Sequence, residues 1–237
     1  MSLTQIENYA NLVNIKTKED QLMFVNPNDQ YISRNLMYAG VWEPHMVNVF
    51  KKYIKEDMKV MDIGANIGSH TLVLSKLVGS RGKVYAFEPC KINHDILFMN
   101  CFINKCSNVD IYKLGCGDKK KKMFIESRWN ETKKEDNYGC IVLQSDQNNK
   151  SDEQIEIVPV DTLDLQVDFI KIDAETMEDK VLTGLKNTIE KCRPYMIVEI
   201  HRDELDRVVP ILEKYNYILE QIDSIDFLAI PKDKQLK

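Results

Sequence analysis

The residues best suited to chemistry are two acids and a pair of glycines that follow neighbouring predicted strands. Residues 60–68 read Val-Met-Asp-Ile-Gly-Ala-Asn-Ile-Gly, an apolar strand that reaches Asp62 and then breaks into a turn bounded by glycines. Glycine has no Cβ, so the backbone of such a turn can come close to a ligand. A second predicted strand, 83–87, leads into Glu88. A carboxylate there can accept hydrogen bonds from both ribose hydroxyls, so the two motifs predict a nucleoside pocket.

The acid before the turn distinguishes this pattern from a dinucleotide-binding motif. A pyrophosphate site would read G-x-G-x-x-G, and the middle glycine is missing here. Asp62 would repel a pyrophosphate but suits a ligand with an ammonium and a sulfonium, which is S-adenosylmethionine. We therefore expect Gly64, Asn66 and Gly68 to lie beneath the methionine part of this cofactor, with S-adenosylhomocysteine as the product. The alternative is a tight turn that binds nothing.

Composition limits the classes of protein to consider. The chain has 237 residues, of which 43% are hydrophobic and 29% charged, and a net charge of −5. This size fits one α/β domain with a modest extension. No apolar run approaches the roughly 18 residues that a membrane span needs, and no signal peptide is recognised. The acidic balance argues against binding nucleic acid through charge. The six cysteines lack metal-ligand spacing, so we expect reduced thiols and a cytoplasmic protein.

Strands and helices alternate through most of the chain. Core strands are predicted at 59–63, 83–87, 109–114, 169–172 and 195–200, with helices at 69–77, 92–104 and 178–191. This alternation predicts an α/β fold with a doubly wound, mostly parallel sheet. Two terminal strands, at 217–221 and 227–230, are expected to form an antiparallel edge.

Two regions outside this alternation are expected to cover the site. The extension, 1–55, has a predicted helix to about residue 14, a strand at 22–25, a partner strand or short helix at 31–38, and a helix at 45–54 opened by Pro44. The remaining residues, 56–237, form the predicted cofactor-binding domain. Its insertion between the third and fourth core strands has predicted strands at 122–126, 141–143 and 155–160, separated by the polar stretches 127–140 and 144–154.

Taken together, the motifs resemble those of the FkbM family of S-adenosylmethionine-dependent methyltransferases. The similar segments, spread over about residues 22–230, are 40–44, 62–68, 87–89, 117–118, 163–164, 168–175, 181–184 and 199–200. The resemblance implies a class I, Rossmann-like methyltransferase fold. It also implies methylation of hydroxyl groups on sugars, glycans or secondary metabolites. One position departs from the family: Thr176 stands where relatives usually have glycine. Glycine permits a positive φ there, whereas threonine is stiff at χ1.

Three further acids complete the predicted cofactor site, each with a structural alternative. Glu88 is expected to bind the ribose, although lone glutamates at strand ends are commonly surface residues. Asp118 either accepts the adenine amino group or caps the following turn. Glu43 either contacts cofactor or substrate or only precedes a helix that begins with proline.

Methyl transfer to a hydroxyl also needs a group that takes up the proton. Asp173 and Glu175 follow the fourth core strand and His201 follows the fifth, so all three are expected at the carboxyl edge of the sheet. We prefer Asp173 as the base, while His201 could equally be a surface residue. Lys171 is expected to neutralise one of the carboxylates. A divalent ion on Asp173, Glu199 and His201 is an alternative we do not favour, because the fifth strand lacks paired carboxylates.

We therefore expect an S-adenosylmethionine-dependent O-methyltransferase that acts on a sugar or glycan hydroxyl. Its partners would be that acceptor, and glycosyltransferases are considered as associates; no nucleic acid and no membrane span are expected. The alternatives are an O-methyltransferase of a small secondary metabolite and a non-catalytic S-adenosylmethionine-binding module. A nicotinamide oxidoreductase is disfavoured by the absent glycine motif. A nucleic-acid methyltransferase is ranked last because the chain is acidic and lacks base-methylation motifs.

Overall fold

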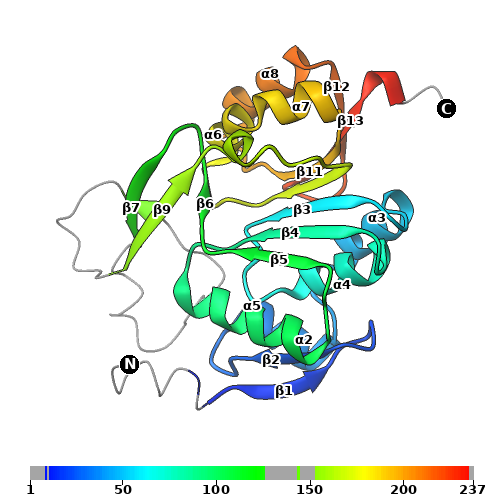
Figure 1. Ribbon diagram of the computed structural model, residues 1–237, viewed down its shortest axis with the longest axis vertical. Helices are drawn as coiled ribbons and strands as arrows, with labels where there is room; N and C mark the ends of the chain where they lie inside the picture. Colours follow the sequence, from blue (N-terminus) through cyan, green and yellow to red (C-terminus); the bar gives the residue numbers. More distant parts are fainter. Residues whose placement is uncertain (1–8, 10, 126–142, 145–152, 235–237) are drawn as a thin grey trace.

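A seven-stranded sheet forms the centre of the computed structural model, which describes residues 9, 11–125, 143–144 and 153–234. The strand order is β12-β13-β11-β10-β3-β4-β5 (Figure 1). Its strands are β3 (Lys59–Ile63), β4 (Lys83–Phe87), β5 (Val109–Tyr112), β10 (Phe169–Ile172), β11 (Tyr195–Glu199), β12 (Tyr217–Gln221) and β13 (Asp226–Pro231). The five core strands are parallel, and β13 and β12 add an antiparallel edge. The predicted fold class is confirmed.

Helices cover both faces of this sheet, because successive side chains of a strand point to opposite sides. On one face Val60 of β3 packs with Phe50 and Leu74, which belong to α3 (Pro44–Tyr53) and α4 (Ser69–Val78). On the other face Met61 packs with α6 (Glu178–Gly184), α7 (Lys186–Cys192) and α8 (Leu205–Lys214). The central strands are therefore buried on both sides, which explains why their sequences read as continuous apolar runs.

One predicted helix, 178–191, is wrong as a single element. The chain forms α6 and α7 instead, with Leu185 between them. The carboxylate of Asp161 accepts hydrogen bonds from the backbone N–H groups of Asn187 and Thr188, at 2.8 and 2.9 Å. Asp161 thereby satisfies free N–H groups at the start of a new helix, which is what a helix N-terminus needs. The α8 helix, which contains Pro210, was not predicted.

The N-terminal region forms a two-stranded hairpin and a short helix. β1 (Val13–Lys16) pairs antiparallel with β2 (Leu22–Val25), and α2 (Ile32–Ala39) follows. Residues 1–8 and 10 of the predicted opening helix lie outside the described residues, and its end is wrong because Val13 and Asn14 belong to β1. The helical alternative for 31–38 is the one the structure adopts.

The β2 strand is attached to α5 (Lys91–Ile103) by side-chain amides. Asn100 accepts a hydrogen bond from the N–H of Phe24 at 2.6 Å and donates one to its carbonyl at 3.1 Å. Asn104 makes the same pair of bonds to Leu22, at 3.0 and 2.6 Å. The hairpin is thus held against α5 at the lower end of the molecule in Figure 1.

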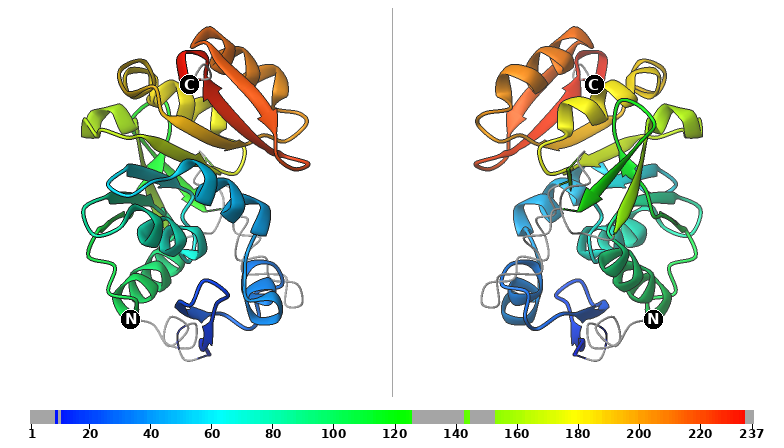
Figure 2. Two further views of the ribbon diagram at one scale, coloured as in Figure 1. Left: turned by 90° about the vertical axis from the view of Figure 1, so that its right-hand side faces the viewer. Right: turned by 90° about the vertical axis from the view of Figure 1, so that its left-hand side faces the viewer.

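A second sheet contains the insertion, with strand order β6-β9-β7-β8. Its strands are β6 (Gly115–Cys116), β7 (Lys121–Ile125), β8 (Leu143–Gln144) and β9 (Gln154–Val158) (Figure 2). The predicted strands at 122–126 and 155–160 correspond to β7 and β9. The stretch 127–140, most of 144–154 and most of the predicted strand at 141–143 lie outside the described residues. In the part of the chain that is described, no helix is long and apolar enough to cross a membrane.

Candidate active site

A cavity of about 600 Å³ opens at the carboxyl ends of β3, β4, β10 and β11. This volume suits a cofactor-sized ligand. Its wall comes from the turns after these strands, from β6 and from the N-terminal region. Among the lining residues are Tyr31, Trp42, Glu43, Gly64, Asn66, His70, Glu88, Asn93, Cys116, Lys171, Asp173, Glu175, Thr176, Glu199 and His201.

Seven of the ten residues predicted for the site line this cavity: Glu43, Gly64, Asn66, Glu88, Asp173, Glu175 and His201. Asp62, Gly68 and Asp118 do not. Asp62 is fully buried, and Gly68 precedes α4 at a place where an added Cβ would meet Leu97. One carboxylate oxygen of Asp118 is buried without a hydrogen-bond partner. The structure therefore gives these three residues no surface on the cavity.

Lys171 lies buried between two of the predicted acids. β10 and β3 are parallel neighbours in which Lys171 is the register partner of Asp62, so both side chains lie on the same face of the sheet. The Lys171 Nζ atom lies 3.0 Å from Asp173 Oδ2, 3.2 Å from the Gly64 carbonyl oxygen and 3.7 Å from Asp62 Oδ1. The Thr71 hydroxyl donates a 2.6 Å hydrogen bond to Asp62 Oδ2. One ammonium thus links the ends of two central strands.

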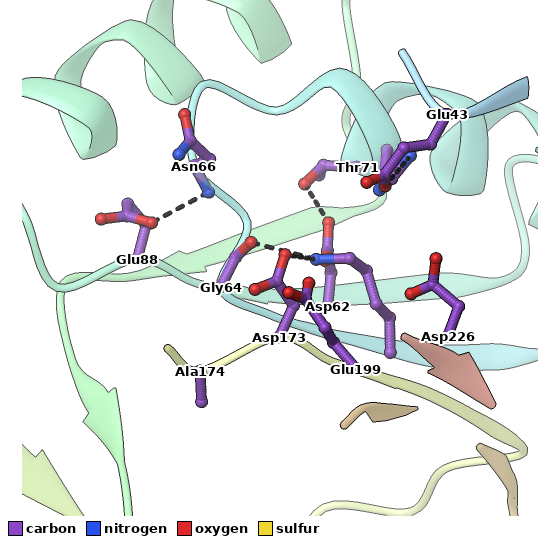
Figure 3. Close-up of polar contacts among 12 residues, drawn as sticks. Glu43, Asp62, Gly64, Asn66, Thr71, Glu88, Asp173, Ala174, Glu199 and Asp226 are labelled. Carbon is purple, nitrogen blue, oxygen red and sulfur yellow. Dashed lines mark hydrogen bonds and ion pairs between the residues drawn. The ribbon is translucent and has the colours of Figure 1, made fainter. Parts of the chain in front are cut away.

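The acids around Lys171 outnumber the cations, as Figure 3 shows for Glu43, Asp173, Glu199 and Asp226. Burial opposes the charge of Lys171, but the carboxylates of Asp173, Asp62 and Glu43 outweigh it and raise the pKa of the ammonium. Desolvation raises the pKa of Glu43 to about 7. Desolvation, reinforced by the charge of Asp173, raises the pKa of Glu199 to about 9. The cavity therefore disfavours further negative charge and favours a cation.

Glu88 connects the turns that follow β3 and β4. Its Oε2 accepts a hydrogen bond from the Asn66 N–H and its Oε1 accepts one from the Cys90 N–H, both at 2.9 Å. Burial raises the pKa of Glu88 to about 7, although the two N–H groups oppose this rise. Each carboxylate oxygen has a second lone pair, so Glu88 can still accept bonds from a ligand.

At Gly64 and Gly68, the structure gives a reason for glycine that differs from the reason predicted from the sequence. A Cβ on Gly64 would lie 1.8 Å from the carbonyl oxygen of Asp173, and φ at Gly64 is +76°. A Cβ on Gly68 would lie 2.6 Å from Leu97 Cδ1, with φ at +91°. The close neighbours are other parts of this chain. Glycine is therefore needed here for the turn to pack, and the close approach of a ligand to this turn stays a prediction.

Thr176, which stands where relatives usually have glycine, adopts the backbone conformation that glycine favours. Thr176 has φ of +73° and the preceding Glu175 has φ of +50°. The chain thus follows the left-handed route that glycine would favour, with a β-branched residue that adopts it at a cost. Thr176 and Glu175 both line the cavity.

His70 is a cavity residue that the sequence analysis missed. It lies on α4, is 4% exposed, and its Nε2 has no hydrogen-bond partner and lies 3.6 Å from Glu43 Oε2. Desolvation lowers its pKa well below the usual value, so the ring is neutral. Its position within a helix of mixed polarity carried no signal of this role.

The structure does not bring the alternative metal ligands together as a compact group. Within the described residues, the three ligand-type atoms that lie within 4.8 Å of one another belong to His45, Asp223 and Asp226. These residues do not line the cavity. Asp226 instead pairs with His45, whose Nε2 lies 2.9 Å from Asp226 Oδ2.

Comparison with known proteins identifies the family. A model of the methyltransferase FkbM domain matches residues 62–219, well over half of the chain. The chain belongs to the FkbM methyltransferase domain family. A model of the protein-L-isoaspartate (D-aspartate) O-methyltransferase family matches residues 7–96, which is less than half of the chain. No curated protein matches this FkbM chain.

Solved structures support the fold of this FkbM domain. Methyltransferase FkbM from Methylobacillus flagellatus is 21% identical with a TM-score of 0.51, and the match covers 74% of this chain but only 44% of that protein. Trm5b from Pyrococcus abyssi is 13% identical with a TM-score of 0.50, covering 93% of this chain and 56% of that one. The FkbM resemblance and the class I methyltransferase fold are thus confirmed, and the family uses S-adenosylmethionine.

Replacing Gly64 with alanine tests the packing role of the turn. We expect Gly64→Ala to lower the free energy of unfolding by about 2–5 kcal/mol, since overpacking costs about 1–3 and the left-handed backbone about 1–2 kcal/mol. Gly40→Ala is the matched control: φ and ψ there are +66° and 10°, in the left-handed region, and the new Cβ would come no closer than 3.3 Å to another atom, Lys18 Cγ. Equal losses in urea unfolding of both variants would contradict the clash with Asp173.

Replacing Thr176 with glycine tests the strain at the departure from the family. Thr176→Gly should raise the free energy of unfolding by about 1 kcal/mol, because relief of about 1–3 kcal/mol of backbone strain exceeds the added chain entropy of glycine. Thr176→Val keeps the β-branch and should give no such gain. Urea unfolding measures both, and a loss of stability in Thr176→Gly would mean that the threonine is not strained.

Proposed function

We propose that this protein is an S-adenosylmethionine-dependent O-methyltransferase whose acceptor is an uncharged sugar or glycan hydroxyl. The observation that carries the proposal is the charge of the cavity. Of the described residues that line it, five are acids and one is a lysine. The acids are Glu43, Glu88, Asp173, Glu175 and Glu199.

The residues present fit this cofactor. Glu88 retains lone pairs for the ribose hydroxyls, and the turn at 64–66 offers backbone beside it. Glu43 and Asp173, which also line the cavity and whose charges act on Lys171, supply negative charge that would favour an ammonium. The neutral His70 ring can accept a hydrogen bond through its unpaired Nε2. When bound, S-adenosylmethionine supplies an electrophilic methyl group on its sulfonium.

Two groups compete for the acceptor proton. Asp173 Oδ2 lies 3.0 Å from the Lys171 ammonium, so an oxygen that would have to take the proton is already occupied by a partner. His201 Nε2 lies 3.1 Å from Glu199 Oε1, the arrangement in which a carboxylate orients an imidazole that takes a proton. We propose that His201 with Glu199 receives the proton and that Asp173 with Glu175 borders the acceptor. This reverses the ranking made from sequence.

The negative charge of the cavity also limits which class of acceptor can bind. Phosphate groups placed beside Asp173 and the ionised form of Glu43 would be repelled, so nucleic acids and other phosphorylated acceptors are disfavoured. Neutral polyols avoid this repulsion and can donate hydrogen bonds to the carboxylates. A small secondary-metabolite hydroxyl remains the second candidate, because the same carboxylates would accept it. We also propose that the N-terminal region and the insertion cover the acceptor, since Trp42 and Cys116 line the cavity.

The function itself is tested by screening neutral oligosaccharides, nucleotide sugars and phenolic alcohols for S-adenosylhomocysteine release. We expect turnover with a neutral saccharide and none with phosphorylated analogues. Binding of S-adenosylmethionine without turnover on any acceptor would favour the non-catalytic module. Binding of NAD in its place would exclude the proposal.

Cofactor affinity should rise as the pH rises toward 7. The pKa values of Glu43 and Glu88 are raised to about 7 by burial, and a cationic ligand favours the ionised forms. Binding therefore releases protons, and affinity rises by up to about tenfold per pH unit for each proton until pH 7 is passed. Calorimetry at pH 6 and 8, in two buffers of different ionisation enthalpy, measures this. Proton uptake would contradict the assignment of these acids.

Paired substitutions distinguish the two bases. His201→Ala should lower kcat by roughly 10²- to 10⁴-fold, the usual contribution of a positioned base, without weakening cofactor binding. In the wild type, kcat should rise with pH toward 9, because Glu199 must lose its proton before the pair can accept another. Asp173→Asn should lower kcat less than His201→Ala. The opposite order of the two effects would return the role to Asp173.

A further inference from the structure

Two glutamates outside the cavity wall are buried, although no family motif or predicted role accounts for them. Glu178 on α6 is 1% exposed and Glu204, which precedes α8, is 0% exposed. Neither lines the cavity. Fully buried carboxyl groups are rare unless they are paired, because leaving water disfavours the charge.

Each glutamate holds the loop that carries a candidate catalytic residue. Glu178 Oε1 accepts a 2.8 Å hydrogen bond from the N–H of Ala174, the residue after Asp173. Glu204 Oε2 accepts a 3.2 Å hydrogen bond from the N–H of His201. The two acids thus anchor the loops that follow β10 and β11.

The two carboxyl groups also face one another. The charge of Glu204 acts on Glu178, and the second oxygen of Glu178, Oε2, is buried without a hydrogen-bond partner. A proton on that oxygen would be donated to Glu204. Burial, together with the charge of Glu204, raises the pKa of Glu178 to about 8, against the opposing hydrogen bond from Ala174. At neutral pH the pair therefore holds one proton.

Other charged groups nearby do not replace this proton. Arg207 on α8 lies 3.2 Å from Glu204 Oε1 and 3.6 Å from Asp179 Oδ1. Lys180 pairs with Asp179 at 3.0 Å, on the same helix as Glu178. Both cations thus pair with other acids, and neither supplies a partner for Glu178.

We propose that Glu178 and Glu204 are positioning residues: one shared proton joins the loop after β10 to the loop after β11, and so fixes Asp173 and Glu175 relative to His201. The catalytic meaning rests on the proposed function, but the connection between the loops does not. When the shared proton is lost, two buried carboxylates repel one another and the loops separate. The folded-state pKa of Glu178 lies above its usual value, so this stabilisation is complete at low pH and is lost as pH rises toward 8.

Glu178→Gln is the variant that tests the shared proton. The amide carbonyl can still accept the Ala174 N–H, and the amide NH₂ can donate to Glu204 at every pH. Hydrogen exchange read by mass spectrometry over 173–177 and 200–204 compares this variant with the wild type. Relative to the variant, we expect exchange in the wild type to become at least about tenfold faster between pH 6.5 and pH 9.5, because the shared proton is still bound at pH 6.5 and is lost by pH 9.5, more than one pH unit above the Glu178 pKa. Comparison at one pH cancels the intrinsic pH dependence of exchange.

Three controls accompany this measurement. Glu190→Gln removes an exposed charge on α7 and should follow the wild type at both pH values. Glu178→Ala removes the acceptor for Ala174 and should exchange rapidly at both. If it does not fold, as judged by near-ultraviolet circular dichroism, Glu204→Gln replaces it: its amide can donate to Glu178, so it should also lose the pH dependence.

Turnover then tests the positioning role. With an acceptor found in the screen, the ratio of kcat for Glu178→Gln to kcat for the wild type should rise at least about tenfold between pH 7 and 9.5, while the Kd for S-adenosylmethionine keeps a constant ratio. Titrations shared by both enzymes, such as that of Glu199, cancel in these ratios. An exchange ratio that does not change with pH would overturn the shared proton. A pH-dependent exchange ratio with a constant kcat ratio would overturn the positioning of the catalytic residues.

Discussion

The buried ammonium of Lys171 is the interaction on which the site depends. It lies between Asp62 and Asp173 and against the Gly64 carbonyl, where the two central strands end. Breaking such a buried pair by removing one partner costs about 3–5 kcal/mol, because the other charges stay buried without compensation. Lys171 thus has two consequences: it permits several carboxylates to gather in one place, and it leaves their sum negative. The first consequence concerns the stability of the fold, and the second concerns the charge of the ligand that can bind.

The elements that the sequence predicted are those defined by local pattern. The five core strands are short apolar runs bounded by turn residues, and each was found within two residues of its predicted limits. The elements that were missed depend on distant partners. The break between α6 and α7 depends on Asp161, which is 26 residues before Asn187. Likewise, β1 pairs with β2, and its four residues are too few for their alternation to outweigh the helical spacing of the segment before them.

The residues of the site also divide into those predictable from local pattern and those that depend on distant partners. Acids and turns at strand ends are predictable, because parallel strands bring their carboxyl ends to one edge. What could not be predicted is which atoms come close across that edge. Asp62 is beside Lys171 only through the register of β3 with β10, and Gly64 is required because the Asp173 carbonyl lies where a Cβ would be. The burial of Glu178 and Glu204 was equally invisible, since both stand among polar residues in the sequence.

Asn100 of α5 and Asn104, the residue that follows this helix, have a consequence for the free edge of the N-terminal hairpin. A strand with one free edge offers unpaired backbone groups to other chains and so invites aggregation. Here Asn100 and Asn104 occupy the groups of Phe24 and Leu22 on that edge. Four residues of helix rise about 6.0 Å, and two residues of strand advance about 6.6 Å. Because these lengths nearly match, a helix with amides four residues apart can imitate a neighbouring strand and close the edge without adding one.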